Sequence, residues 1–113
     1  MLPSKLRINK TLFKTFGRGT SFHSPAISLF VYKKDDHSNS QFSFSVSKKV
    51  SKLAVKRNKL RRQGYSVISK NLDSIKKGYF VVFNFKKEAI GLSYNQIESD
   101  IKVLLQKAEL GVL

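Results

Sequence analysis

The stretch from Phe42 to Arg62, FSFSVSKKVSKLAVKRNKLRR, joins an alternating apolar segment to the most basic segment of the chain. Phe42, Phe44 and Val46 alternate with serines, and this period of two predicts a strand with one face on a core. From position 48 to position 62 the chain holds eight cations in fifteen residues and no carboxylate. Such a run repels itself unless a polyanion neutralises it, so it predicts a surface that binds phosphate.

The whole chain shares this charge bias. Its 113 residues include 22 Lys and Arg against 7 Asp and Glu, a formal net charge of +15, and 41 % of the residues are apolar. This length and apolar content predict a single domain, residues 1–113, with one core. A basic protein of this size usually binds nucleic acid or an anionic membrane surface.

The sequence also bears on the cellular compartment of the protein, through its lack of membrane-spanning runs, signal peptide and cysteines. No apolar run approaches the ~18 residues needed to span a bilayer, and the N-terminus has no signal-peptide core. The absence of Cys excludes disulfides and thiolate metal sites and suits a reducing cytosol. We therefore expect a cytoplasmic protein.

The N-terminal quarter predicts a basic arm and a short helix. Residues 1–8 carry Lys5 and Arg7 without any period, which indicates a flexible, extended arm. Asn9 is expected to cap a helix through Phe16 that ends at a glycine. Leu12, Phe13 and Phe16 fall on neighbouring faces of that helix, so either all three belong to the core or one ring is left at the surface. Residues 20–25 are expected to form a loop or a short edge segment.

The next apolar run, residues 26–32 (AISLFVY), has the length and composition of a strand. The Asp, Asn and Ser cluster after it predicts a turn, and with residues 42–47 it predicts a hairpin. Ile27, Leu29 and Val31 face one way, whereas Phe30 faces the other. A sheet covered by helices on one side does not need Phe30 on its other side, so Phe30 and Phe16 are candidates for an exposed aromatic platform.

Two longer helices and an inner strand complete the predicted fold. A helix from about Leu53 to Asn71 gathers its apolar residues, Leu53, Leu60, Val67 and Ile68, on one stripe and leaves the rest of its surface cationic. Gly64 lies on the packed side, where it costs about 1 kcal/mol relative to Ala unless close approach to the sheet requires it.

Residues 79–85 (YFVVFNF) predict an inner strand parallel to residues 42–47, and the capping box of Ser93 and Gln96 starts a last amphipathic helix. The class is α+β, in the order α-β-β-α-β-α, as a two-layer sandwich with a mixed sheet.

The sequence offers no catalytic constellation. The seven carboxylates are scattered, the two His residues have no partner in a motif, and no glycine-rich phosphate loop follows a strand. The residues alone therefore predict an RNA-binding or DNA-binding domain with a basic helix and a possible aromatic face.

The segment SVSKKVSKLAVKRNKLRR closely resembles the signature of the bacterial ribonuclease P protein component, in which a Ser-Lys-Lys strand end leads into a basic helix start. Lys5 and Leu6 resemble the family's basic arm, and Leu12 through Gly19 resemble its aromatic first helix. The sequence departs from the family pattern at Lys59, where Arg is usual, and at Gly64 and Tyr65.

The resemblance implies a protein subunit for a catalytic RNA, which removes the 5′ leader of precursor tRNA by hydrolysis that uses Mg²⁺ at the RNA. It implies a left-handed βαβ crossover, one protein per RNA and no catalytic or metal-binding residue in this chain. It assigns contact with the catalytic RNA to Lys48, Lys49, Lys52, Lys56, Arg57, Asn58, Lys59, Arg61 and Arg62. It assigns the leader to a cleft with Leu12, Phe16 and Phe30 as its wall and with Lys5 and Arg7 on the phosphates, as suits unstacked bases.

Three other classes remain as alternatives. A ribosomal-type RNA-binding protein shares the charge and fold but needs no aromatic cleft. A DNA-binding module needs a recognition helix with a few side chains aimed at base edges. A membrane-surface helix needs an exposed apolar face, whereas Leu53, Leu60 and Val67 are expected to cover the sheet.

Overall fold

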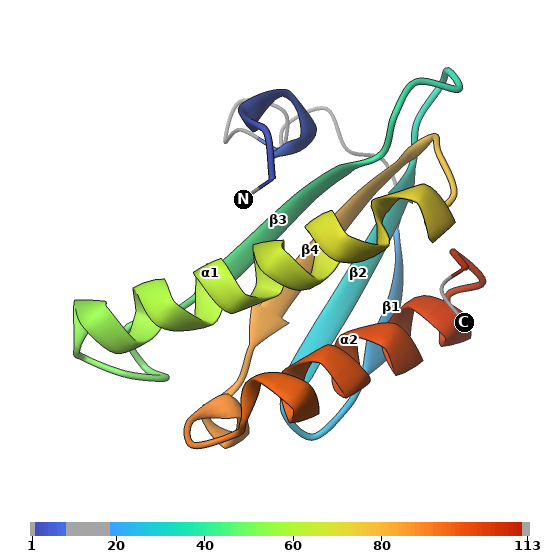
Figure 1. Ribbon diagram of the computed structural model, residues 1–113. Coiled ribbons are helices and arrows are strands. Elements are labelled where there is room, and N and C mark those ends of the chain that lie inside the picture. Colours follow the sequence, from blue (N-terminus) through green and yellow to red (C-terminus); the bar gives the residue numbers. More distant parts are fainter. Residues whose placement is uncertain (1, 9–18, 112–113) are drawn as a thin grey trace.

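The computed structural model describes residues 2–8 and 19–111, which form one mixed sheet with two helices on one of its faces (Figure 1). The strands are β1 (Thr20–His23), β2 (Ile27–Lys33), β3 (Gln41–Val46) and β4 (Tyr79–Phe85). The helices are α1 (Ala54–Asn71) and α2 (Tyr94–Lys107), and three short 3₁₀ turns are η1 (Ser4–Leu6), η3 (Leu72–Ser74) and η4 (Lys87–Ala89). The predicted α+β class is confirmed. The helix predicted from Asn9 to Phe16 lies outside the described residues.

The strand order β1-β2-β4-β3 corrects the predicted hairpin. β2 does not pair with β3, because β4 lies between them, antiparallel to β2 and parallel to β3. β4 is apolar on both faces, so the centre of the sheet buries it best. The hairpin in this part of the chain is instead β1 with β2, and the Ser24 hydroxyl holds its turn through the amide and carbonyl of Ile27. The segment at residues 20–25 is thus a short edge strand and turn.

The connection from β3 through α1 to β4 is a parallel crossover, as the sequence predicted. In Figure 1 both strands run towards the lower left with α1 in front of them, and β4 lies to the right of β3. This arrangement is a left-handed crossover, against the right-handed form found in roughly 98 % of such units. The fold therefore has the unusual crossover that the family resemblance implied.

Both helices bury their apolar stripes against the same face of the sheet. Leu60, Val67 and Ile68 of α1 are buried, as are Ile97 and Ile101 of α2, and they pack on the alternating core residues of β2, β3 and β4. Leu53 is an exception to the predicted stripe. It precedes the first turn of α1 and is 59 % exposed, because the helix begins one residue later and beyond the edge of the sheet.

Gly64 is a point of close approach between α1 and the sheet. A Cβ built at this position would lie 2.4 Å from Cδ1 of Phe44, so even alanine would displace the phenylalanine ring. The Phe44 ring is itself fixed, since it stacks on Phe83 with a centroid separation of 4.6 Å. Of the two alternatives that the sequence left open at Gly64, the structure shows the close approach to the sheet that requires glycine.

The N-terminal segment differs from the extended arm that we expected. Leu2 and Leu6 are buried in the core cluster, and residues 4–6 form the turn η1. Arg7 then pairs with Phe42 on the outer edge of β3, where the amide of Ile8 donates to the Phe42 carbonyl at 2.8 Å. Two leucines account for the difference, because their burial anchors a segment that otherwise has no periodic pattern.

Candidate nucleic-acid interface

The basic surface begins at the turn between β3 and α1. Lys48 and Lys49 are exposed on this turn, which closes through a hydrogen bond from the Val50 amide to the Ser47 carbonyl. Arg57, in the first turn of α1, donates from Nη1 to the carbonyl of Ser51 at 2.7 Å. This bond ties the segment that follows the lysine turn to the first turn of the helix.

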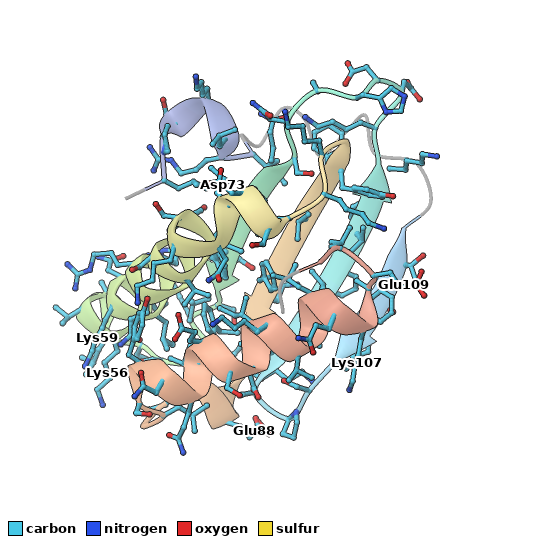
Figure 2. The ribbon with its side chains drawn as sticks, turned by 45° about the vertical axis from the view of Figure 1, so that its right-hand side comes forward. Lys56, Lys59, Asp73, Glu88, Lys107 and Glu109 are labelled. Carbon is cyan, nitrogen blue, oxygen red and sulfur yellow. The ribbon has the colours of Figure 1, made fainter. Side chains whose placement is uncertain are left out.

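The cations predicted to bind the catalytic RNA are accessible along this surface. Arg57 and Arg61 are half-buried, and the other predicted residues are exposed: Lys48, Lys49, Lys52, Lys56, Asn58, Lys59 and Arg62. None of these cations forms a salt bridge with a carboxylate of residues 2–8 or 19–111. Asn58 accepts a hydrogen bond from the Arg61 guanidinium, which orders that side chain on the helix surface. Figure 2 shows Lys56 and Lys59 side by side on one flank of α1, near the start of α2.

The opposite flank of α1 brings together residues that the sequence assigned to different sites. Arg7 lies against α1, with its guanidinium carbon 5.9 Å from the centre of the Tyr65 ring. A hollow of about 420 Å³ is lined by Arg7, Asn58, Arg61, Arg62 and Tyr65. Nε of Arg7 is buried without a hydrogen-bond partner in the described part of the chain. The sequence assigned Arg7 to the phosphates of the leader, and the structure places its side chain on the helix side of the sheet, beside Tyr65.

Tyr65 is a member of this surface that sequence reasoning missed. Its hydroxyl accepts a hydrogen bond from the Phe44 amide at 3.4 Å, and its ring meets Phe44 edge to face at 5.0 Å. The sequence shows only a tyrosine in a helix. No local pattern connects position 65 with position 7, so the signal lies in the tertiary contact alone.

The other face of the sheet carries the predicted aromatic position. Phe30 is half-buried there, on the side opposite the two helices, and its ring lies edge to face with His23 at 6.0 Å. Phe80 of β4 is on the same face, with Nζ of Lys34 4.9 Å from its ring centre. Partial burial lowers the pKa of Lys34, although Asp36 opposes this effect. Phe80 was missed, although the apolar residues on both faces of YFVVFNF are the signal that identified Phe30.

Of the other residues assigned to the leader, Lys5 is exposed beside the edge strand β3, where its backbone carbonyl accepts a hydrogen bond from the Gln41 side chain. Leu12 and Phe16 lie outside the described residues, so their assignment stays a prediction. The arrangement therefore consists of a basic helix surface on one side of the sheet and an aromatic strip on the other.

Among residues 2–8 and 19–111, no three His, Cys, Asp or Glu side chains are grouped so that they could hold a metal ion. In the same ranges, no helix has the length and apolarity required to cross a membrane.

A small α+β protein with an unneutralised basic helix and an aromatic sheet face belongs to the class of RNA-binding or DNA-binding domains. The family model described as Ribonuclease P matches residues 3–109. The ribonuclease P protein component of Clostridium botulinum (strain 657 / Type Ba4) is 37 % identical over 109 residues, which cover 96 % of each chain. That of Pseudanabaena sp. (strain PCC 6903) is 30 % identical over 112 residues, or 97 % of each chain.

The fold agrees with this family. A Staphylococcus aureus RNase P protein mutant superimposes with a TM-score of 0.85 at 21 % identity, over 94 % of this chain and 90 % of the other. The chain belongs to the ribonuclease P protein family. It is thus the protein subunit of an RNA-catalysed endonuclease that processes the 5′ end of tRNA, as the signature segment predicted.

Proposed function

We propose that the lysine turn and the exposed side of α1 bind the catalytic RNA of ribonuclease P. The residues in this role are Lys48, Lys49, Lys52, Lys56, Arg57, Asn58, Lys59, Arg61 and Arg62. The observation that carries the proposal is the lack of any carboxylate partner for these cations within the described residues. Release of counterions from RNA phosphates supplies the binding free energy of such a surface.

The same proposal assigns the 5′ leader of precursor tRNA to the face of the sheet opposite α1 and α2. Phe30 and Phe80 offer ring surfaces there, and Lys5 supplies a cation near the sheet edge. Single-stranded RNA suits this combination, because its unstacked bases can lie on aromatic rings while cations follow the backbone. Leu12 and Phe16 are proposed to complete the wall. Arg7, which lies against α1, is reassigned to the catalytic RNA.

The proposal includes one protein per RNA, action in the cytoplasm and Mg²⁺ as the metal of the reaction. The described side chains do not fit a protein-held Mg²⁺ site, because no three His, Cys, Asp or Glu side chains among them are brought together. The metal is therefore assigned to the RNA and its phosphates.

The deciding experiment adds the purified protein to a bacterial ribonuclease P RNA and measures cleavage of precursor tRNA at low Mg²⁺. We expect faster removal of the leader. If five phosphates are neutralised, affinity should fall roughly 10²-fold or more between 50 and 200 mM salt. A ribosomal-type RNA-binding protein would bind RNA without accelerating cleavage, and a flat salt dependence would contradict the phosphate contacts.

The leader assignment has its own test, the variant Phe30→Ala. Loss of one stacked base costs about 1–3 kcal/mol, so binding of precursor tRNA to the assembled enzyme should weaken. Mature tRNA has no leader, and its binding should be nearly unchanged. Equal losses for both RNAs, together with a lower melting temperature, would instead identify Phe30 as a packing residue.

A further inference from the structure

A second groove borders the basic surface on the side of α2, away from the hollow around Tyr65. It has a volume of about 330 Å³ and is lined by Lys56, Lys59, Leu60, Gln63, Ala89, Ile90, Gly91 and Leu92. The groove therefore lies between the first half of α1 and the connection from η4 to α2. Figure 2 shows Lys56 and Lys59 on this flank, whereas Glu88 lies on the lower side of the molecule.

The apolar lining of the groove is part core and part exposed surface: Leu60 and Ala89 are buried and Leu92 is half-buried, whereas Ile90 lies outside the core. Ile90 is 38 % exposed, and the neighbouring start of α1 carries Val55, which is 76 % exposed. Phosphate binding needs cations and no aliphatic surface. Exposed apolar side chains beside unneutralised lysines therefore indicate a ligand that carries both an apolar part and negative charge.

The polar groups of the groove are placed for such a ligand. Lys56 and Lys59 lie one helical turn apart on its rim, and neither has a carboxylate partner among the described residues. Gln63 is a further turn along α1, and its side-chain amide makes no hydrogen bond to another described residue. Gly91, at φ +88°, has no atom within 4 Å of the position that a Cβ would take, so the wall at this point is open.

We propose that this groove binds one unpaired nucleotide of the catalytic RNA. The base packs against Ile90 and Leu92, the Gln63 side-chain amide pairs with its edge, and Lys56 and Lys59 contact the flanking phosphates. An amide carries both donors and an acceptor, so it can pair with the polar edge of a base. The volume is at the lower limit of the roughly 300–1,000 Å³ of small-molecule sites, which suits a single nucleotide.

This inference rests on the proposed function of α1 and adds base recognition to it. A protein partner could cover the apolar residues, but only a partner with negative charge also neutralises the two lysines. RNA supplies both features in one nucleotide, whereas the phosphate backbone alone leaves the apolar side without a contact.

The first test compares Ile90→Ser with the control Val103→Ser, which alters an apolar side chain of similar exposure (43 %) on α2. Neither substitution changes the charge. We expect Ile90→Ser to bind ribonuclease P RNA at least tenfold more weakly at a fixed salt concentration, with an unchanged salt slope. The control should bind like the parent. Equal affinities of Ile90→Ser and the parent would overturn the proposal.

The variant Gln63→Ala keeps the test decisive if Ile90→Ser melts at a lower temperature. Alanine favours the helix at this position, so the fold should not be weakened. Loss of the amide should still reduce affinity for the RNA several-fold, and an unchanged affinity would overturn base recognition. If Arg62→Glu weakens binding while both groove variants do not, the proposed function stands and only the nucleotide site fails.

A direct probe uses two short oligonucleotides of five units, one of single-stranded RNA and one of abasic ribose phosphates with the same charge. With ¹³C-methyl labelling, the Ile90 methyl resonances should shift on titration with the RNA and stay in place with the abasic chain. Equal shifts with both chains, or none with either, would contradict a site for a base.

Discussion

The two helices pack on the same face of the sheet, yet they are stabilised in different ways. α2 has a complete capping box. The Ser93 hydroxyl accepts a hydrogen bond from the backbone amide of Gln96, and the side-chain carbonyl of Gln96 accepts one from the backbone amide of Ser93. α1 has Leu53 at its N-cap with no side-chain hydrogen bond, and its first turn has no acidic residue. It begins instead with Lys56 and Arg57, whose charges oppose the positive end of the helix dipole.

The two halves of α1 also differ in their polar contacts with α2. Near its C-terminal end α1 is joined to α2, where Lys70 lies 4.6 Å from the Tyr94 ring centre and 3.8 Å from a Glu98 oxygen. The interaction with the Tyr94 side chain raises the pKa of Lys70, and the negative charge of Glu98 acts in the same direction. The half of α1 that carries the predicted RNA contacts has no such partner among the described residues. The comparison indicates that both helices depend on packing against the sheet, and that α2 also has a local cap at its start, which α1 lacks.

The strongest way to break this comparison is Gly64→Val, which attacks the packing on which α1 depends. We expect destabilisation of about 3 kcal/mol, because the new side chain overlaps the fixed Phe44 ring. The measurement is denaturant unfolding. Ser69→Val introduces the same side chain at an exposed position of α1 and should change stability by less than about 0.5 kcal/mol. Similar losses in both variants would point to helix propensity and away from the contact with the sheet.

Charge reversal on α1 should produce the next largest effect. Arg62→Glu is expected to weaken binding of the catalytic RNA about 10-fold to 100-fold, since it removes a phosphate contact and adds repulsion. The exposed position of Arg62 leaves the fold intact, so the melting temperature should hold. Lys107→Glu makes the same charge change at the end of α2 (Figure 2). Equal weakening by the two variants would show that net charge, and no particular surface, governs binding.

Removal of the N-cap of α2 should produce the third largest effect, a loss of stability. Ser93→Ala removes the hydrogen bond to the Gln96 amide and should lower the free energy of unfolding by about 1 kcal/mol. Thermal or denaturant unfolding gives this value, and RNA affinity should remain that of the parent. Ser99→Ala, at an exposed position inside the same helix, controls for the loss of a hydroxyl. A Ser93→Ala variant as stable as Ser99→Ala would mean that α2 does not rely on its cap.

The smallest effect has the opposite sign. Leu53→Ser gives α1 the cap that it lacks, on a backbone already extended at φ −84° and ψ 114°. We expect a gain of about 0.5–1 kcal/mol, because the lost leucine surface was mostly exposed. The measurement is again the free energy of unfolding, with Val55→Ser, inside the helix, as the control that creates no cap. A loss of stability in Leu53→Ser would show that this leucine contributes to packing.

Most of the basic site could be predicted from the sequence, because its residues are neighbours along one helix and its turn. Lys56, Lys59 and Arg62 share an accessible surface for the reason that periodicity gave, and the family signature covers the same segment. The position of Arg7 could not be predicted. Its contact with Tyr65 joins residues 58 positions apart, and it depends on the burial of Leu2 and Leu6, which place the N-terminal segment on the edge of β3.

By itself the sequence determined where α1, α2 and the strands β2, β3 and β4 form and which of their faces are largely apolar, because these properties depend on residues a few positions apart. Alternation in β3, the stripe of α2 and the capping box at Ser93 are all local, and each follows from the sequence alone. Only the tertiary structure decided that β4 lies between β2 and β3 and that the crossover is left-handed. Strand order depends on which non-local pairing buries the most apolar surface, and no spacing within a single segment encodes that choice.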